Sequence, residues 1–242
     1  SFGRNGASPA YLSTTFGHDC ITYGVVSIAG GAGAGTGNPD APTNGDGYCS
    51  FAWGKDTLAL GQRSAAFGTE NTAGSINSFA SGSQSETGIG LDTHPNGIAS
   101  SGNCAFAYGL RAKAYGDYSI ALGSFITAYN GSQVIGKGIN TGSLLVNSLV
   151  NSLALGYGVD VPTVIMTDSG GVNNGFGKLG INTHDPKERV EINIKANDVV
   201  AIRSAAGGGG KLDLQGTLTG NISASIFRIE YTSPNSGQAY GK

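Results

Sequence analysis

The sequence predicts an all-β fold in which short parallel strands stack as a repeating coil. An apolar-Ala-apolar-Gly unit returns every seven residues, large and small side chains alternate within it, and 42 of the 242 residues are glycine. Disordered chains lack apolar residues and carry a high net charge, whereas this chain is 39% hydrophobic with a formal net charge of −2. A Gly-rich but folded repeat structure is therefore expected.

The unit occurs in two runs and one later copy. Its clearest examples are Phe51-Ala52-Trp53-Gly54, Phe106-Ala107-Tyr108-Gly109 and Leu153-Ala154-Leu155-Gly156. We expect the glycine after each strand to supply the positive φ or tight bend that turns the chain. These repeat-defining glycines are Gly54, Gly61, Gly68, Gly82, Gly109, Gly116, Gly123 and Gly156.

A seven-residue period usually suggests a coiled coil, but this one does not fit a helix. Each helical glycine would cost about 1 kcal/mol relative to alanine, and the apolar seam of a coiled coil is missing. Alternation of apolar residues is the signature of a strand. Each heptad is thus one short strand plus a turn, and two heptads make one coil of about 14 residues. Because stacked copies bury a continuous face, we predict a solenoid-like β-roll.

Two faces follow from the alternation. We expect large residues such as Phe51, Trp53 and Leu122 to lie inside the roll. The alanines, for example Ala52 and Ala121, then form an outer column that packs on neighbouring chains in a homo-oligomer. The alternative is that alanine merely tolerates the tight stacking of coils.

The units Thr57-Leu58-Ala59-Leu60-Gly61 and Ser119-Ile120-Ala121-Leu122-Gly123 resemble the head repeats of trimeric autotransporter adhesins. The match covers roughly residues 17–157, with interruptions. The resemblance implies a left-handed parallel β-roll of 14-residue double repeats that assembles as a homotrimer. The left hand is implied by the family alone, since crossovers between parallel strands are generally right-handed.

Residues 177–192 look like a second known segment, G-x-V-G-I-G-T-x-x-P-x-x-x-L-x-V, which is found in bacteriophage tail fibres and related trimeric surface proteins. There it typically precedes a C-terminal intramolecular chaperone domain. Asn182 replaces the usual Gly here, and Asp185 the usual Ser. From the residues themselves we predict a turn at Asp185-Pro186 and a strand from Val190.

We divide the chain into an N-terminal connector (1–16), the repeat head (17–157), a neck (158–189) and a small C-terminal β module (190–242). The repeat breaks at 30–48 and 83–101, and both breaks are expected to be loops. Insertions in a solenoid map to one face, often the binding face. The predicted receptor-contact residues are therefore Asp40, Asn44, Asp46, Asp92, His94 and Asn96.

No motif predicts an enzyme, a metal site or a cofactor. The Gly-rich segment 31–37 is followed by Pro39 and Pro42, so no helix begins there to hold a dinucleotide, and a flexible loop is expected. In His18-Asp19-Cys20, neighbouring side chains of a strand face opposite ways, which does not suit a nucleophile and its base. Acidic residues are present, but the sequence places no two at the separation that glycoside cleavage needs.

The three cysteines cannot all pair within one chain and lack the spacing of a zinc or redox motif. Cys49 and Cys104 each precede a phenylalanine of the repeat by two residues. We therefore expect them on the large-residue face as buried thiols. A bridge between Cys20 and Cys49 on neighbouring coils stays open.

The expected function is that of a structural and receptor-binding segment of a bacteriophage tail fibre, extracellular and in the virion. Expected partners are further copies of the chain in a homotrimer, other tail proteins, and a host cell-surface polysaccharide or protein. The chain has no basic cluster for nucleic acid and no apolar stretch for membrane insertion. The alternatives are the head of a bacterial trimeric surface adhesin, located on the bacterial surface, and a polysaccharide-degrading tailspike.

Overall fold

The computed structural model describes residues 1–37, 47–88, 103–129, 131–168, 177–187 and 190–193. All of them belong to the compact unit Ser1–Asn197, whereas the second unit, Asp198–Lys242, lies outside the described residues. The described part contains 18 strands in one mostly parallel sheet and no helix, which confirms the all-β prediction. Within these ranges there is accordingly no helix long and apolar enough to cross a bilayer.

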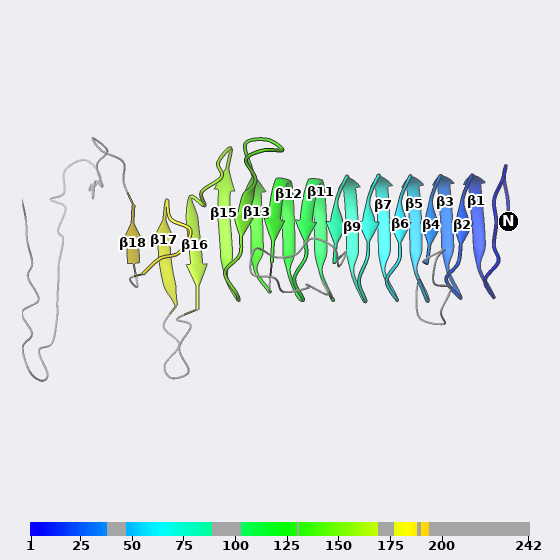
Figure 1. Ribbon diagram of the computed structural model, residues 1–242, viewed down its shortest axis with the longest axis horizontal. Helices are drawn as coiled ribbons and strands as arrows, with labels where there is room; N and C mark the ends of the chain where they lie inside the picture. Colours follow the sequence, from blue (N-terminus) through cyan, green and yellow to red (C-terminus); the bar gives the residue numbers. More distant parts are fainter. Residues whose placement is uncertain (38–46, 89–102, 130, 169–176, 188–189, 194–242) are drawn as a thin grey trace, which may run out of the picture. The chain divides into compact units, whose positions relative to one another are not determined.

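Five-residue strands alternate with two-residue strands along the first part of the chain, and Figure 1 shows them in one row. The long strands are β1 (Thr14–His18), β3 (Ile28–Ala32), β5 (Phe51–Lys55), β7 (Ala65–Thr69) and β9 (Phe79–Ser83). The short strands are β2 (Ile21–Thr22), β4 (Gly35–Thr36), β6 (Leu58–Ala59), β8 (Thr72–Ala73) and β10 (Glu86–Thr87). β11 (Phe106–Ala114) and β12 (Ile120–Ala128) each join a long and a short part, and β13 (Gln133–Lys137), β14 (Leu145–Asn147) and β15 (Leu153–Tyr157) follow.

Long strands pair in parallel with long strands, and short strands with short strands. In the pairing of β5 with β7, for instance, Phe51 lies opposite Ala65 and Gly54 opposite Gly68. Partners in this pair are fourteen residues apart, the period that the sequence predicts, whereas β3 and β5 pair across 23 residues because an insertion separates them. The pairing begins earlier than expected, because Phe2 bridges to Phe16 and Ala7 to Ile21. Part of the predicted connector 1–16 therefore pairs with the first strands of the stack.

The alanines lie inside the stack and the large residues outside, so this part of the prediction was wrong. Ala52, Ala66 and Ala121 have no exposed surface, whereas Trp53 is 46% and Leu58 39% exposed. Only two residues join the end of a long strand such as β5 to the short strand that follows. So short a corner holds the two sets of strands close together, and the space between them accepts alanine, serine and threonine.

The chain turns at a residue in the left-handed region, which recurs every seven positions. Asp56, Arg63 and Glu70 are consecutive examples, with φ of 52°, 53° and 54°. This corrects the expected role of the repeat glycines. Gly54, Gly68, Gly82, Gly109 and Gly123 have positive φ but lie within strands, and Gly61, Gly116 and Gly156 have no positive φ.

The glycines of the long strands are required by close stacking as well as by φ. A Cβ added to Gly68 would lie 2.2 Å from the carbonyl oxygen of Gly82, one coil further on. The same close approach recurs from Gly3 to Gly136, with the next glycine of the column as the obstacle each time. We call this set the glycine column: Gly3, Gly17, Gly31, Gly54, Gly68, Gly82, Gly109, Gly123, Gly136 and Gly156.

A buried serine closes the corner in front of most long strands. The hydroxyls of Ser50, Ser64 and Ser119 each donate to the carbonyl three residues earlier, at 2.6, 2.7 and 2.6 Å. The opposite corner uses a different set, in which the Asn71 amide donates to the carbonyl of Gly82 at 2.9 Å and Asn71 Oδ1 accepts from the Ser85 N–H at 2.8 Å. These serine and asparagine side chains are thus paired with backbone that the turns leave unpaired, whereas the buried hydroxyls of Thr22, Thr57 and Thr87 have no hydrogen-bond partner among the described residues.

The stack ends in antiparallel strands. β16 (Val164–Thr167) runs against β15 and places the buried Ile165 opposite Ala154 at the end of the alanine interior. β17 (Lys178–Ile181) pairs antiparallel with β16, and β18 (Val190–Ile192) pairs in parallel with β17. The predicted strand at Val190 is confirmed, and the segment predicted as a neck, 158–189, contains the strands β16 and β17.

Replacing Val26 by asparagine should stabilise the fold. Val26 occupies a corner with φ of 55° and is 43% exposed. A left-handed conformation costs a β-branched residue roughly 1–2 kcal/mol, and asparagine tolerates it better. We expect the free energy of unfolding to rise by about 1 kcal/mol in urea titrations. Asp56→Asn, at an equivalent corner that already holds a tolerant residue, should change it by less than about 0.5 kcal/mol. Loss of stability in Val26→Asn would contradict the strain argument.

Candidate functional site

The six predicted receptor-contact residues lie outside the described residues. Asp40, Asn44 and Asp46 fall in 38–46, and Asp92, His94 and Asn96 fall in 89–102. The repeat itself continues closer to these segments than expected. Segment 31–37, predicted as a loop, contains the end of β3 and all of β4, because Gly31 follows Gly17 by fourteen residues and joins the same column. A strand pairs through its backbone, so the lack of side chains does not break the stack.

The outward side of the long strands carries a ladder of aromatic rings. Ring centroids are 5.1 Å apart for Phe51 and Phe67, 5.7 Å for Phe67 and Phe79, and 4.8 Å for Phe79 and Phe106. Parallel register sets these rings on adjacent coils, where aromatic pairs contribute beyond their buried area. We call the set the aromatic face: Phe2, Phe16, Phe51, Trp53, Phe67, Phe79 and Phe106.

Gly30 makes room for the largest ring of this face. In the register of the sheet, Gly30 lies between Phe16 and Trp53. A Cβ on Gly30 would lie 2.3 Å from carbons of the Trp53 indole, so the ring covers this glycine. The Trp53 ring also lies 6.4 Å from that of Phe16 and 6.0 Å from that of Phe51. Trp53 therefore joins the two parts of the ladder across a coil with no large side chain at this position.

Apolar side chains continue this surface beyond the rings. Tyr108 is 55% and Ile135 40% exposed at the same strand position as Trp53. Ile120, Leu122, Leu153 and Leu155 extend the outward side as far as β15. A contiguous apolar surface of this extent is uncommon on a monomer and usually marks an interaction site.

The outward side of the short strands is more polar. Glu86 accepts from the Tyr115 hydroxyl at 2.6 Å and pairs with Lys113 at 3.2 Å. Beside them, Gln84 donates to Glu70 at 2.7 Å and accepts from Arg111 at 2.5 Å. A shallow depression is lined by Glu70, Gln84, Glu86, Arg111 and Lys113. Leu58 is a large exposed apolar residue on this side, and Ile21 and Val146 take the outward positions of β2 and β14. The two sides of the stack thus differ in chemistry, and the long-strand side is the one suited to burial.

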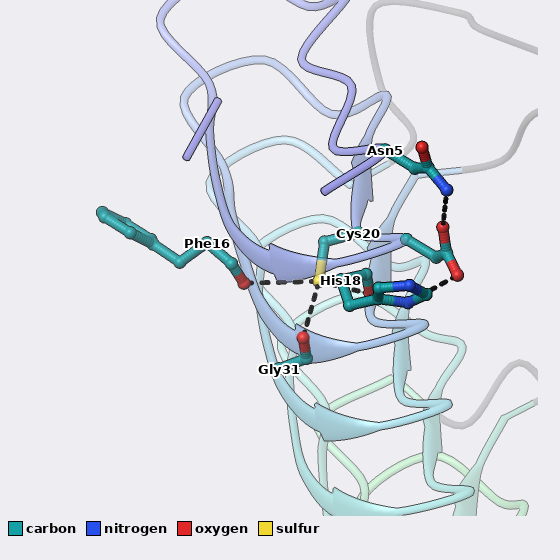
Figure 2. Close-up of polar contacts among 6 residues, drawn as sticks. Asn5, Phe16, His18, Cys20 and Gly31 are labelled. Atoms are coloured by element: carbon teal, nitrogen blue, oxygen red, sulfur yellow. Dashed lines mark hydrogen bonds and ion pairs between the residues drawn. The ribbon is translucent and has the colours of Figure 1, made fainter. Parts of the chain in front are cut away.

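His18, Asp19 and Cys20 do not form a catalytic pair (Figure 2). His18 Nδ1 lies 2.6 Å from Asp19 Oδ2, while the Cys20 thiol lies 3.4 Å from the carbonyls of both Phe16 and Gly31. Cys20 is fully buried at the position that Asn71 occupies elsewhere in the stack. Its thiol therefore satisfies backbone carbonyls, a structural role.

Cys49 and Cys104 are exposed, so the expectation of buried thiols was wrong. Both occupy left-handed corners, with φ of 53° and 56°. The turn interrupts the alternation of the strand, and a residue two positions before the first strand residue no longer shares its face. All three cysteines are free, and the bridge between Cys20 and Cys49 that the sequence left open is not formed.

No cluster of three or more His, Cys, Asp or Glu that could hold a metal ion occurs among the described residues. Glu86 on β10 and Glu70 at the corner after β7 are each engaged by neighbouring donors. His184 is exposed and its ring lies 3.2 Å from the carbonyl oxygen of Asp160. The feature that sequence reasoning missed is the aromatic face. Its signal was available in the fourteen-residue spacing of Phe2 and Phe16 and of Trp53 and Phe67.

Comparison with known proteins identifies no relative of this chain. No protein-family model, curated protein or solved structure matches this chain.

Proposed function

We propose that this chain is a structural and receptor-binding segment of a bacteriophage tail fibre, extracellular in the virion, that mediates attachment to the host cell surface. The observation that carries the proposal is the aromatic face, which lies along one side of a stack whose other side, as far as it is described, has no such ladder of rings. An apolar surface of this kind is stable in water when a second surface covers it. A second and third copy of the same chain, arranged about an axis parallel to the stack, would cover it in a homotrimer.

Two sequence resemblances support the fibre assignment. The head repeats resemble those of trimeric adhesins, from which we take a left-handed parallel β-roll for the stacked coils. The segment that resembles a tail-fibre motif contains β17 and β18, at the end of the stack. In this assignment the trimer is not an enzyme and binds no cofactor. It joins other tail proteins and presents its insertions to a host polysaccharide or protein.

The mass of the protein in solution tests the assembly. Light scattering should give three times the 24.3 kDa of one chain. Trp53→Asp places a charge on the aromatic face and should yield folded monomers, since a buried unpaired charge costs several kcal/mol. Leu58→Asp makes the same chemical change on the short-strand side and should leave the mass unchanged. A monomeric wild-type protein, or equal effects of the two variants, would contradict the proposed assembly.

Attachment distinguishes the fibre from its two alternatives. Fluorescently labelled protein should bind intact cells of some bacterial isolates in a panel and lose that binding when surface polysaccharide or protein is stripped. Binding restricted to animal cells or extracellular-matrix proteins would instead favour an adhesin head. The only support for that alternative is the resemblance of the repeats to those of trimeric adhesins. Release of reducing oligosaccharides from capsular polysaccharide would favour a tailspike.

A further inference from the structure

The two corners that flank each long strand differ in their side chains, and the difference bears on how copies would meet. One corner residue lies two positions before the strand and the other directly after it, seven positions later. For β7 these are Arg63 and Glu70, at opposite ends of the strand and both exposed. The Arg63 side chain has no hydrogen bond or ion pair with the described residues, although its backbone N–H donates to the carbonyl oxygen of Tyr48. Glu70 Oε2 accepts a hydrogen bond from Gln84, whereas Glu70 Oε1 has no hydrogen bond or ion pair with the described residues.

Cyclic symmetry decides which corners would face each other. If three copies turn their long strands towards a common axis, the interface is heterologous, and the leading corner of one copy adjoins the trailing corner of the next. Rotation about an axis parallel to the stack does not change a residue's height along it. Residues that flank the same strand would therefore meet between copies, which brings Arg63 of one copy level with Glu70 of its neighbour.

Other levels of the stack show the same kind of complementarity. The corners of β9 are Asn77 and Gln84, two amides that can exchange hydrogen bonds. The corners at the long part of β12 are Tyr118, which is 71% exposed, and Phe125, two aromatic rings. At β1, β5 and β11 one corner residue is apolar or a cysteine and the other is charged. These three strands therefore offer no complementary pair of corners.

We propose that neighbouring copies join along these corners, with an ion pair between Arg63 of one copy and Glu70 of the next as the contact that sets their relative height. This inference rests on the proposed homotrimer and names the residues that align it. Charge complementarity of this kind contributes more to register and specificity than to raw affinity. A displacement by one coil, about 4.8 Å, in one direction would bring Arg63 opposite the uncharged Gln84. In the other direction Arg63 would meet Asp56, but Asn77 would no longer lie opposite Gln84, nor Tyr118 opposite Phe125.

Charge reversal tests the pairing. Sedimentation velocity should show that Arg63→Glu and Glu70→Arg each raise the trimer dissociation constant about tenfold, because repulsion replaces attraction at three sites. The double variant should recover most of the wild-type value. Circular dichroism controls for folding. A monomeric wild-type chain would overturn the homotrimer itself. A wild-type trimer with unaffected single variants, or a double variant no better than the singles, would overturn only the corner pairing.

Cross-linking supplies a second readout that does not depend on charge. In a background with Cys49 and Cys104 changed to serine, Arg63→Cys with Glu70→Cys should give covalent trimers on oxidation. The two positions are about 20 Å apart within one chain, too far for a bridge inside it. The matched pair Arg63→Cys with Arg111→Cys is two coils out of level, about 10 Å, and should not cross-link. Equal cross-linking of both pairs would contradict the proposed alignment.

Discussion

Gly123→Ala should unfold the stack or remove about 4 kcal/mol or more of its stability, whereas Gly158→Ala should cost only about 1–2 kcal/mol. Both glycines have positive φ, 138° at Gly123 and 66° at Gly158. At Gly123 an added Cβ would lie 1.7 Å from the carbonyl oxygen of Gly136, while at Gly158 it would meet nothing within 4 Å. The difference between the two variants therefore reports the clash together with the less accessible dihedral angle of Gly123.

The clash at Gly123 cannot be relieved locally. The obstructing oxygen belongs to the backbone of β13. A Cβ added to Gly136 would in turn lie 1.7 Å from the carbonyl oxygen of Gly156. Moving one coil aside would thus strain the next one in the glycine column. Urea unfolding followed by circular dichroism measures both variants. Comparable losses of stability would show that the coils can separate and would contradict this account of the column.

Ala66→Leu should destabilise the protein by about 3 kcal/mol, because the interior between the strands has no room for a larger side chain. Ala66 is fully buried and aligned with Ala52 and Ala80 in neighbouring coils. Ala32 is the matched control, because it is an exposed alanine at the end of β3. Ala32→Leu should change the free energy of unfolding by less than about 0.5 kcal/mol.

The same pair of variants separates the two possible orientations of the strands. If the alanines faced neighbouring chains, Ala66→Leu would disturb association and leave the thermal midpoint of the single chain almost unchanged. With the alanines inside, the thermal midpoint falls and any loss of association follows from unfolding. Differential scanning calorimetry together with light scattering distinguishes these outcomes.

The periodic part of the fold was predictable because it depends on spacing. Glycines fourteen residues apart, such as Gly54, Gly68 and Gly82, and an alternation around alanine predict parallel strands in 14-residue coils, and β5, β7 and β9 pair in parallel at this spacing. The orientation of the strands was not predictable in the same way. Alternation divides side chains between two faces without saying which is inside. That choice depends on the length of the corner, such as Asp56-Thr57 after β5, and on the narrow space that it leaves.

The corners and the aromatic face needed information that alternation does not carry. Arg63, Val26 and Tyr118 are not residues from which a left-handed turn is expected, since tertiary stacking overrides their local preference. The exposed cysteines were misplaced for the same reason. The aromatic face follows only once the alanines are known to point inwards. The hand of the coil and the number of chains remain predictions that rest on the resemblances and on the chemistry of the outer surface.

The constant register between coils has a consequence for how such a chain can change in length. Because β5 pairs with β7 and β7 with β9 at the same spacing, deleting residues 65–78 would connect Ser64 directly to Phe79. In every remaining coil, the repeat serine, alanine and glycine would still lie opposite the same residue types in the adjacent coils. Duplication of fourteen residues would act in the same way. Such a chain can therefore lengthen or shorten in steps of about 4.8 Å by recombination within its gene, without redesign of any contact.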